Sequence, residues 1–281
     1  MANKVQVPSD VIFTIRRYDP DNDEAPHYED YKVHVDPGMT VLDGLHVIRE
    51  TQDPSLAWRY SCRMGVCGSC GMLVNGRAML ACNNQILDIS NRRLLIAPLP
   101  NFSIIKDLVP DLGLMFDKHR ALHPYLIRES DKEEMENPTG EYEQSEKELV
   151  RYLQFSYCIR CGCCMAACPT LATDDSYLGP MPLAQGYRWN ADTRDEGFDD
   201  RRSVAGDTHG AYRCHYAGEC SNVCPKGVDP ARAIQLLKTQ LVKDYFHLMK
   251  KGAGCQSQSS RTGNERNPKI PDPPPFTVEK T

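Results

Sequence analysis

Five cysteines crowd into eleven consecutive positions in the segment SYCIRCGCCMAACP of this 281-residue chain. They are Cys158, Cys161, Cys163, Cys164 and Cys168. A tetrahedral zinc site takes four ligands, and one cubane iron-sulfur cluster also takes four. Because five thiols exceed either number, one cysteine is surplus, or one of them binds at a site whose other ligands lie elsewhere in the chain.

Four of these cysteines have the spacing of the bacterial ferredoxin run, C-x2-C-x2-C-x3-C-P. In that run the fourth cysteine ligates the other cluster of a two-cluster domain. The segment therefore predicts a second, partial cysteine run. The stretch RCHYAGECSNVCPKG supplies it, with Cys214, Cys220 and Cys224 at matching positions and Ala217 where the middle thiol is missing.

The two runs together predict two clusters with unequal ligand sets. If Cys224 crosses over, a complete [4Fe-4S] set forms from Cys158, Cys161, Cys164 and Cys224. Only Cys168, Cys214 and Cys220 then remain, and three thiolates favour a [3Fe-4S] centre, because the iron at the Ala217 corner has no ligand. Cys163 is then the surplus thiol. The alternative is a [4Fe-4S] cluster whose fourth ligand is water or another side chain.

An earlier group of cysteines, Cys62, Cys67, Cys70 and Cys82, opens with the C-x4-C-x2-C spacing of a plant-type [2Fe-2S] centre. Three glycines, Gly65, Gly68 and Gly71, allow backbone N–H groups to approach the sulfurs without an intervening Cβ. Structural zinc is the alternative, but it usually takes two short C-x2-4-C pairs separated by a spacer. The group therefore predicts a [2Fe-2S] cluster.

Composition excludes several other classes of function. Thirteen cysteines is an odd number, which with the adjacent pair Cys163-Cys164 speaks against a disulfide framework. The net charge of −5 gives no basic field for nucleic acid. No run of about 18 apolar residues is present, and the N-terminal segment lacks a signal-peptide pattern, so any membrane link is expected to come through a partner.

Hydrophobic periodicity predicts two unlike domains. Alternation over Val11–Tyr18 and Tyr31–Val35, a helix after Thr40 and three further short strands predict a small mixed sheet carrying one helix, in a domain of residues 1–120. An acidic linker is expected over 121–147. A Ser145/Glu148 capping box then opens a helical domain over 148–252. It ends with a helix from Asp229-Pro230 to Gly252 whose apolar face is Ile234, Leu237, Leu241, Tyr245 and Leu248. Residues 253–281 form a proline-rich tail.

Four segments together resemble the iron-sulfur subunit of succinate dehydrogenase and fumarate reductase: SCRMGVCGSC, IKDLVPDL, CIRCGCCMAACP and RCHYAGECSNVCPKGVDPARAI. The resemblance implies an α+β fold, with an N-terminal β-grasp [2Fe-2S] domain followed by an all-α two-cluster domain. It implies electron transfer from an FAD-containing flavoprotein partner, through the three clusters, to a quinone. It also implies a cytochrome b or other membrane anchor partner and a place at the cytoplasmic face of the inner membrane.

The resemblance also implies a quinone site beside the cysteine-deficient centre. The matching positions are Pro169, His215, Ala217, Gln235 and Lys238. Ubiquinone-reducing members carry two consecutive tryptophans shortly after the cluster cysteine, where this chain has Ala172-Thr173, so menaquinone is the expected acceptor. Two alternatives without a functional role stay open: His215 is a loop histidine, and Lys238 is a surface lysine. Another flavin-linked, thiol:fumarate or heterodisulfide reductase subunit, a free-standing ferredoxin and a zinc protein remain the alternative functions.

Overall fold

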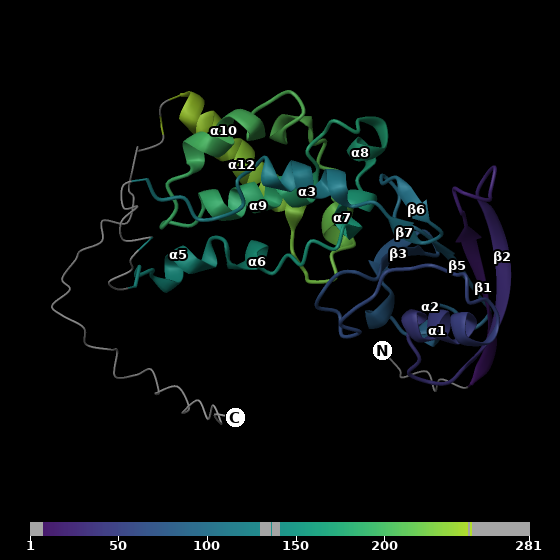
Figure 1. The fold of residues 1–281 in the computed structure, drawn as a ribbon. Helices are drawn as coiled ribbons and strands as arrows, with labels where there is room; N and C mark the ends of the chain where they lie inside the picture. The colour runs from purple at the N-terminus through teal and green to yellow at the C-terminus, as the bar shows by residue number, and fades with distance from the viewer. Residues whose placement is uncertain (1–7, 130–135, 137–140, 247, 249–281) are drawn as a thin grey trace, which may run out of the picture.

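The structure, a computed structural model, describes residues 8–129, 136, 141–246 and 248. A sheet domain and a helical domain lie side by side along the molecule (Figure 1). This is the two-domain α+β arrangement that the sequence predicts. The predicted tail of residues 253–281, including Cys255, and most of the acidic stretch of the predicted linker lie outside the described residues.

The first domain is built on a five-stranded sheet in the order β2-β1-β5-β3-β4. Its strands are β1 (Ser9–Arg17), β2 (His27–Val35), β3 (Gly71–Val74), β4 (Arg77–Leu80) and β5 (Arg93–Ala97). Strand β1 pairs antiparallel with β2 and parallel with β5, so the sheet is mixed, as predicted. Val11, Phe13 and Ile15 alternate along β1 and are fully buried, which is why this segment forms a strand with one face in the core.

Helix α1 (Val41–Thr51) lies across this sheet and has the predicted start. Thr40 and Asp43 form a reciprocal capping box that satisfies two of the free N–H groups at the helix N-terminus. Gly44 lets the helix approach the sheet closely, because a Cβ there would lie 2.4 Å from the ring of Phe13. The domain continues through a 3-10 helix, η1 (Ala81–Asn83), and then α2 (Ile86–Ile89), β6 (Ile104–Lys106) and β7 (Val109–Pro110).

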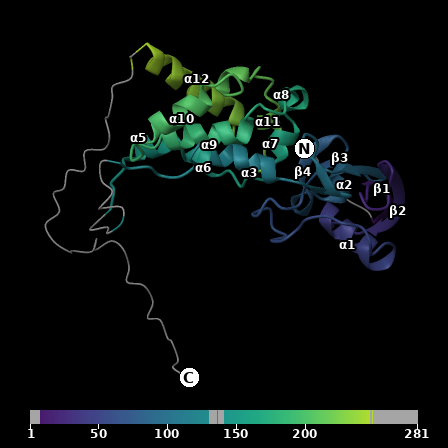
Figure 2. The ribbon, with the colours of Figure 1, turned by 45° about the horizontal axis from the view of Figure 1, so that its top comes forward.

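The second domain consists of short helices around a central pair, α9 (Pro180–Asn190) and α12 (Pro230–Tyr245) (Figure 2). Its other elements are α3 (Gly113–Arg120), α5 (Glu146–Val150), α6 (Leu153–Ser156), α7 (Cys163–Ala166), α8 (Pro169–Thr173), α10 (Phe198–Ala205), the 3-10 helix η2 (Ala211–Arg213) and α11 (Glu219–Asn222). Met115 of α3 packs into the core of this domain. The boundary at residue 120 stays a prediction.

The last helix is shorter than the sequence predicts. Asp229 caps it by accepting from the Arg232 N–H, but α12 ends at Tyr245 rather than at Gly252. Ile234, Leu237 and Leu241 are buried as expected, whereas Tyr245 and Leu248 are exposed. The apolar spacing continues past the point where the helix has a core to pack against, so periodicity overestimates its length.

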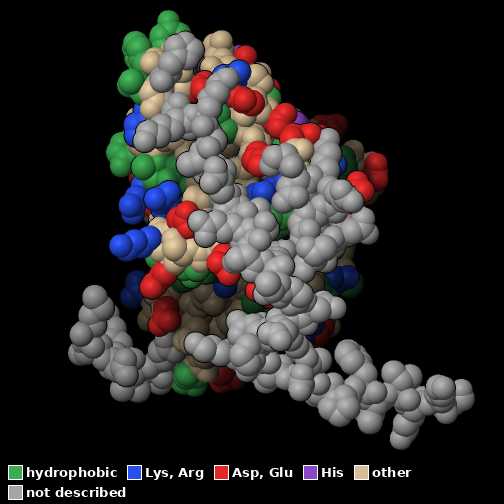
Figure 3. Space-filling view, turned by 90° about the vertical axis from the view of Figure 1, so that its left-hand side faces the viewer, with side chains coloured by type: hydrophobic (Ala, Val, Ile, Leu, Met, Phe, Trp, Pro, Cys, Tyr) green, Lys and Arg blue, Asp and Glu red, His purple; other side chains and the backbone are tan. Residues whose placement is uncertain are grey.

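Exposed apolar side chains gather at the C-terminal end of α12. Val242, Tyr245, Phe246 and Leu248 are each more than 40% exposed there. The space-filling view of this side of the molecule shows hydrophobic side chains at its upper edge, with charged side chains of both signs below them (Figure 3). The face is therefore mixed in character, with one apolar end.

The two domains share an interface that includes the cysteine segments. The Asn101 side-chain N–H donates to the carbonyls of Met165, Ala166 and Cys168 at 2.9–3.1 Å. Arg77 of the sheet domain donates to the Asn222 carbonyl at 3.1 Å. The helical domain is thus held to the sheet domain directly at the cysteine segments, through its own backbone.

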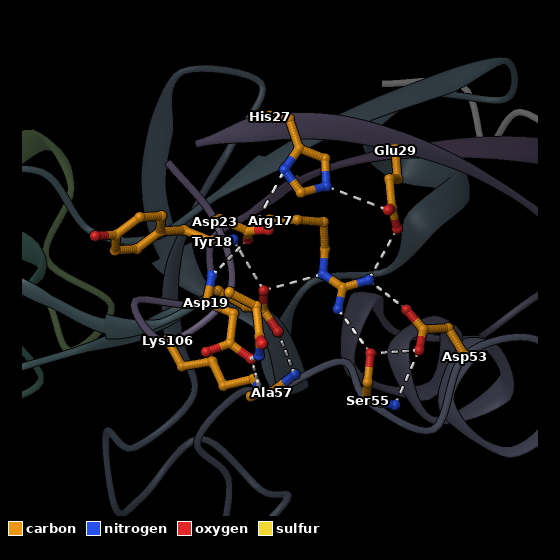
Figure 4. A network of polar contacts seen from close by, with 12 residues as sticks. Arg17, Tyr18, Asp19, Asp23, His27, Glu29, Asp53, Ser55, Ala57 and Lys106 are labelled. Carbon is orange, nitrogen blue, oxygen red and sulfur yellow. Dashed lines mark hydrogen bonds and ion pairs between the residues drawn. The ribbon is translucent and has the colours of Figure 1, made fainter. Parts of the chain in front are cut away.

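A buried arginine joins elements of the sheet domain that lie before and after the first cysteine loop in the chain (Figure 4). The Arg17 guanidinium donates to Asp107 at 3.0 Å, to Glu29 at 2.9 Å and to Asp53 and Ser55. Asp107 in turn accepts from the Ala57 N–H at 2.9 Å. The network therefore joins β1, β2, the segment after α1 and the β6–β7 turn. Its last contact in the segment after α1 is Ala57, five residues before Cys62.

We predict that Arg17→Met lowers the free energy of unfolding of the sheet domain by about 3–5 kcal/mol, because it leaves the buried Asp107 carboxylate without its cation. The matched change, Arg93→Met, removes an exposed ion pair with Asp30 and is expected to cost about 1 kcal/mol or less. The measurement is the urea midpoint of Trp58 fluorescence in full-length protein carrying Trp189→Phe. Equal midpoints for the two variants would contradict the prediction.

Candidate iron-sulfur centres

The first cysteine loop surrounds its thiols with backbone N–H groups. Those of Met64, Val66 and Cys67 point at the Cys62 sulfur at 3.5, 3.3 and 3.2 Å, and the Gly65 N–H points at the Cys82 sulfur at 3.2 Å. These hydrogen bonds lower the pKa of Cys62 to about 6, so its thiolate is stable near neutral pH. The loop is built to hold negatively charged sulfur.

Two of the other thiols of this group face the protein interior, whereas Cys67 is exposed. Cys70 and Cys82 are buried in the core of the sheet domain. Burial and the neighbouring Cys82 thiol together raise the pKa of Cys70 to about 12. Bound iron would offset this cost, because a coordinating thiol loses its proton to the positive charge of the metal. The donor set of four cysteines fits a [2Fe-2S] cluster.

The helical domain contains two copies of one cysteine-binding backbone. Every element of the second copy lies 56 positions after its counterpart. Arg160 and Tyr216 both have left-handed backbone conformations, with φ of 54° and 59°, and the glycines that follow, Gly162 and Gly218, have φ of 82° and 81°. Helix α7 begins directly after the first glycine, and α11 begins directly after the second. The repeat seen in the cysteine spacing is therefore also a repeat of structure.

One cavity of about 390 Å³ lies between these copies and collects four thiols from both of them. The four are Cys158, Cys161, Cys164 and Cys224. Burial, with the nearby Cys161 and Cys224 thiols, raises the pKa of Cys158 to about 11. Met181, Ala184 and Val228 line the rest of the wall with apolar groups. The donor set and the dry wall fit a [4Fe-4S] cluster.

A second cavity, of about 310 Å³, collects three thiols, from Cys168, Cys214 and Cys220. Ala217 also lines it. Because the backbone around Ala217 repeats that around Cys161, its methyl group occupies the place where a fourth thiol would stand. Burial, with the neighbouring Cys168 and Cys214 thiols, raises the pKa of Cys220 to about 11. This donor set fits a cluster with three iron corners.

Cys163 lies outside both cavities. It is fully buried and packs into the core of the sheet domain. A hydrogen bond from its thiol lowers the pKa of Cys161 to about 7, and the same contact, together with burial, raises the pKa of Cys163 itself. A protonated thiol that donates to a neighbouring sulfur supports that sulfur rather than coordinating the metal, and this supports the prediction that Cys163 is surplus.

The residues expected around a quinone are brought together only in part. Pro169, His215 and Ala217 line the three-thiol cavity, and all three are exposed. Gln235 and Lys238 lie on α12 and do not line the cavity. The Lys238 ammonium donates to the Cys214 carbonyl at 2.9 Å, and the Gln235 side-chain nitrogen is buried with no hydrogen-bond partner among the described residues. Lys238 is therefore a neighbour of the cysteine segment rather than a free surface lysine.

Sequence reasoning missed two features of these sites. Tyr177, in the segment DDSYLGP, reaches into the three-thiol cavity, although nothing in its local pattern links it to the cysteines. Asn101 ties the sheet domain to the Cys168 carbonyl. Both contacts join residues far apart in the chain, so only the fold reveals them.

Comparison with known families agrees with these cavities. Residues 12–117 match the family described as a 2Fe-2S iron-sulfur cluster binding domain, and residues 154–228 match the family described as a 4Fe-4S dicluster domain. The protein is thus a two-domain iron-sulfur protein.

Comparison with similar proteins shows to which family within this class the chain belongs. The chain is 43% identical to the fumarate reductase iron-sulfur subunit of Mycobacterium tuberculosis, over 81% of this chain and 91% of the relative. It is 40% identical to the succinate dehydrogenase iron-sulfur subunit of Paracoccus denitrificans, over 82% and 87%. A chain of the Mycobacterium smegmatis Sdh1 complex in the apo form superposes with a TM-score of 0.76 at 26% identity, over 85% of this chain and 98% of that one. The chain belongs to the family of iron-sulfur subunits of succinate dehydrogenase and fumarate reductase.

Family membership confirms the electron-transfer role that the sequence predicts. In such oxidoreductases the dicarboxylate chemistry belongs to the flavoprotein, and this chain is the iron-sulfur subunit. In the part of the chain that the structure describes, no helix is long and apolar enough to cross a membrane.

The first and second cysteine loops touch at Gly68. Its φ is +75°, and a Cβ there would lie 2.8 Å from the Cys161 Cβ and 2.9 Å from its Cα. A side chain therefore cannot be added without moving a cysteine of the four-thiol cavity. The two loops are held at backbone contact because this position is glycine.

We predict that Gly68→Ala lowers the urea midpoint and speeds the loss of iron to a chelator. Gly76→Ala is the matched control, since Gly76 has a similar φ of +79° but nothing within 4 Å of its Cβ position. That control should cost only the backbone strain, about 1–2 kcal/mol. Absorbance of the clusters in air-free protein follows the loss, and equal rates in the two variants would refute the role of the contact.

Proposed function

We propose that the chain holds three clusters and passes electrons from a flavoprotein partner to a membrane quinone. The [2Fe-2S] ligands are Cys62, Cys67, Cys70 and Cys82, the [4Fe-4S] ligands are Cys158, Cys161, Cys164 and Cys224, and the [3Fe-4S] ligands are Cys168, Cys214 and Cys220. The clusters supply one-electron transfer when bound. The chain positions their ligands, lines the four-thiol cavity with apolar side chains and sets the sulfur environment by hydrogen bonds.

The observation that carries this proposal is the unequal thiol content of two cavities built on the same repeated backbone. Cys224 crosses from the second copy to complete the set of the first. Cys168 crosses the other way, but it joins only two thiols because Ala217 replaces the third. The backbone around Ala217 repeats the backbone around Cys161, so the two cavities differ at this corner by one side chain. The rest of the site is already shaped for a fourth ligand.

We predict that Ala217→Cys converts the third centre to [4Fe-4S]. Air-free protein of this variant should contain one more iron per chain, and its oxidised EPR spectrum should lose the [3Fe-4S] signal. Ala217→Ser is the matched control of similar size, and it should keep that signal because a hydroxyl is a poorer iron ligand than a thiolate. Unmutated protein that already shows two [4Fe-4S] clusters in Mössbauer spectra would overturn the assignment.

We further propose that the quinone is menaquinone and that it binds at the exposed rim of the three-thiol cavity. Pro169, His215 and Ala217 form this rim, and Gln235 and Lys238 lie on α12. Ala172 and Thr173 stand where ubiquinone-linked relatives have two tryptophans. The partners are then an FAD-containing flavoprotein and a cytochrome b or other membrane anchor, which places the chain at the cytoplasmic face of the inner membrane.

We expect the intact complex to turn over a menaquinone analogue faster than a ubiquinone analogue in membranes. His215→Ala should raise the KM for the preferred quinone about fivefold, the loss that one hydrogen bond accounts for. Electron transfer to a soluble dye is the control, and it should not change. Faster turnover with the ubiquinone analogue would contradict the quinone assignment, and an unchanged KM would remove His215 from the site.

A further inference from the structure

A tyrosine hydroxyl with no partner reaches into the three-thiol cavity. Tyr177 is fully buried and lines this cavity together with Cys168, Cys214 and Cys220. Its hydroxyl makes no hydrogen bond within the described part of the chain. A buried hydroxyl without an acceptor is costly, so an unpaired one that faces a ligand cavity points to an acceptor that belongs in the cavity.

The backbone around Tyr177 is held firmly. The Lys118 ammonium donates to the Tyr177 carbonyl at 2.7 Å, and the following Leu178 N–H donates to the His209 carbonyl at 2.9 Å. Asp174, which accepts from the Tyr177 N–H, is itself bound by the Arg213 side chain at 2.8 Å, one residue before Cys214. The ring is thus positioned by the same segment that carries a thiol of the cavity.

The thiols of this cavity receive little support from other donors. The Tyr216 N–H donates to the Cys214 sulfur at 3.4 Å. The Ser221 hydroxyl lies 4.0 Å from the Cys220 sulfur, but it gives its single proton to Asp229 at 2.5 Å. Cys62 of the first loop, by contrast, receives three backbone N–H groups. The Cys214 sulfur therefore has fewer N–H donors than the Cys62 sulfur of the first loop, and a further donor would stabilise the sulfurs of the three-thiol cavity.

The tyrosine is in the form that can donate. A phenol has an ordinary pKa of about 10, so the Tyr177 hydroxyl keeps its proton at physiological pH. Because Tyr177 is fully buried, a hydrogen bond from its hydroxyl to charged sulfur is stronger than the same bond in water.

We propose that Tyr177 donates a hydrogen bond to a sulfur of the centre held by Cys168, Cys214 and Cys220, and thereby raises the reduction potential of that centre. A donor to sulfur stabilises the reduced cluster, which carries one more negative charge, more than the oxidised one. Tyr177 is a tuning residue, separate from the cysteine ligands and from the quinone rim. This inference rests on the proposed three-iron assignment of the cavity.

The test is a redox titration followed by EPR on the intact complex purified from membranes without air. Tyr177→Phe removes only the hydroxyl and keeps the packing. We expect the third centre to become about tenfold harder to reduce, which for a one-electron couple is a fall of about 59 mV in its midpoint potential. The midpoints of the other two clusters should stay where they are.

Tyr187→Phe is the matched control. Tyr187 is also a buried tyrosine, on α9 against Phe155, but it does not line the three-thiol cavity. Its removal should leave all three midpoints unchanged. A third-centre midpoint that does not move in Tyr177→Phe, or that moves equally in both variants, would overturn the inference.

A second measurement applies if Tyr177→Phe assembles without the third centre. Unmutated complex from cells grown on 3-fluorotyrosine carries a more acidic phenol, which donates more strongly, so the third midpoint should rise. An unchanged midpoint there would overturn the inference. A separate result would contradict the proposed function: the oxidised, unmutated complex would show no [3Fe-4S] signal. That result is available before any variant is compared.

Discussion

The burial of several thiols side by side is the constraint around which this molecule is arranged. Each cavity gathers three or four sulfurs, and burial, with a smaller contribution from neighbouring sulfurs, raises the pKa of Cys158, Cys164 and Cys220. Such sites are unfavourable without a compensating positive charge, which bound iron supplies. The left-handed residues and glycines of the loops also stabilise negatively charged sulfur, because they turn backbone N–H groups toward it. In an ordinary strand or helix these N–H groups would bond to carbonyls.

The exchange of cysteines between the two repeated runs determines how the helical domain folds. Cys224 belongs in sequence to the second run but lines the cavity of the first, and Cys168 does the reverse. Each cavity therefore closes only when α7 and α11 pack together, which they do. The helices here are short and have little intrinsic stability. Cluster binding and the packing of α9 against α12 consequently stabilise the domain together.

Local chemistry in the sequence was sufficient to predict the starts of α1, α5 and α12 and to group the thiols that the two cavities gather. Fixed spacing identifies the thiols because a loop that wraps a cluster has few possible lengths, and Thr40 and Ser145 mark helix starts because their caps are local. The end of α12 was predicted wrongly, since it depends on where the core ends. The role of Tyr177 could not be predicted at all, because its hydroxyl meets the cysteines only through the fold.

Contacts between the two domains determine the order in which the three cysteine groups lie. Gly68 brings the first cysteine loop into contact with Cys161, while Asn101 holds the carbonyls of the segment that ends at Cys168. The four-thiol cavity thus adjoins the sheet domain, and the three-thiol cavity reaches the surface through His215 and Ala217 on the far side of Cys168. Because one polypeptide segment carries both Cys164 and Cys168, a movement of that segment would shift both cavities together. The close approach at Gly68 and the Asn101 hydrogen bonds hold the three cysteine groups in their order.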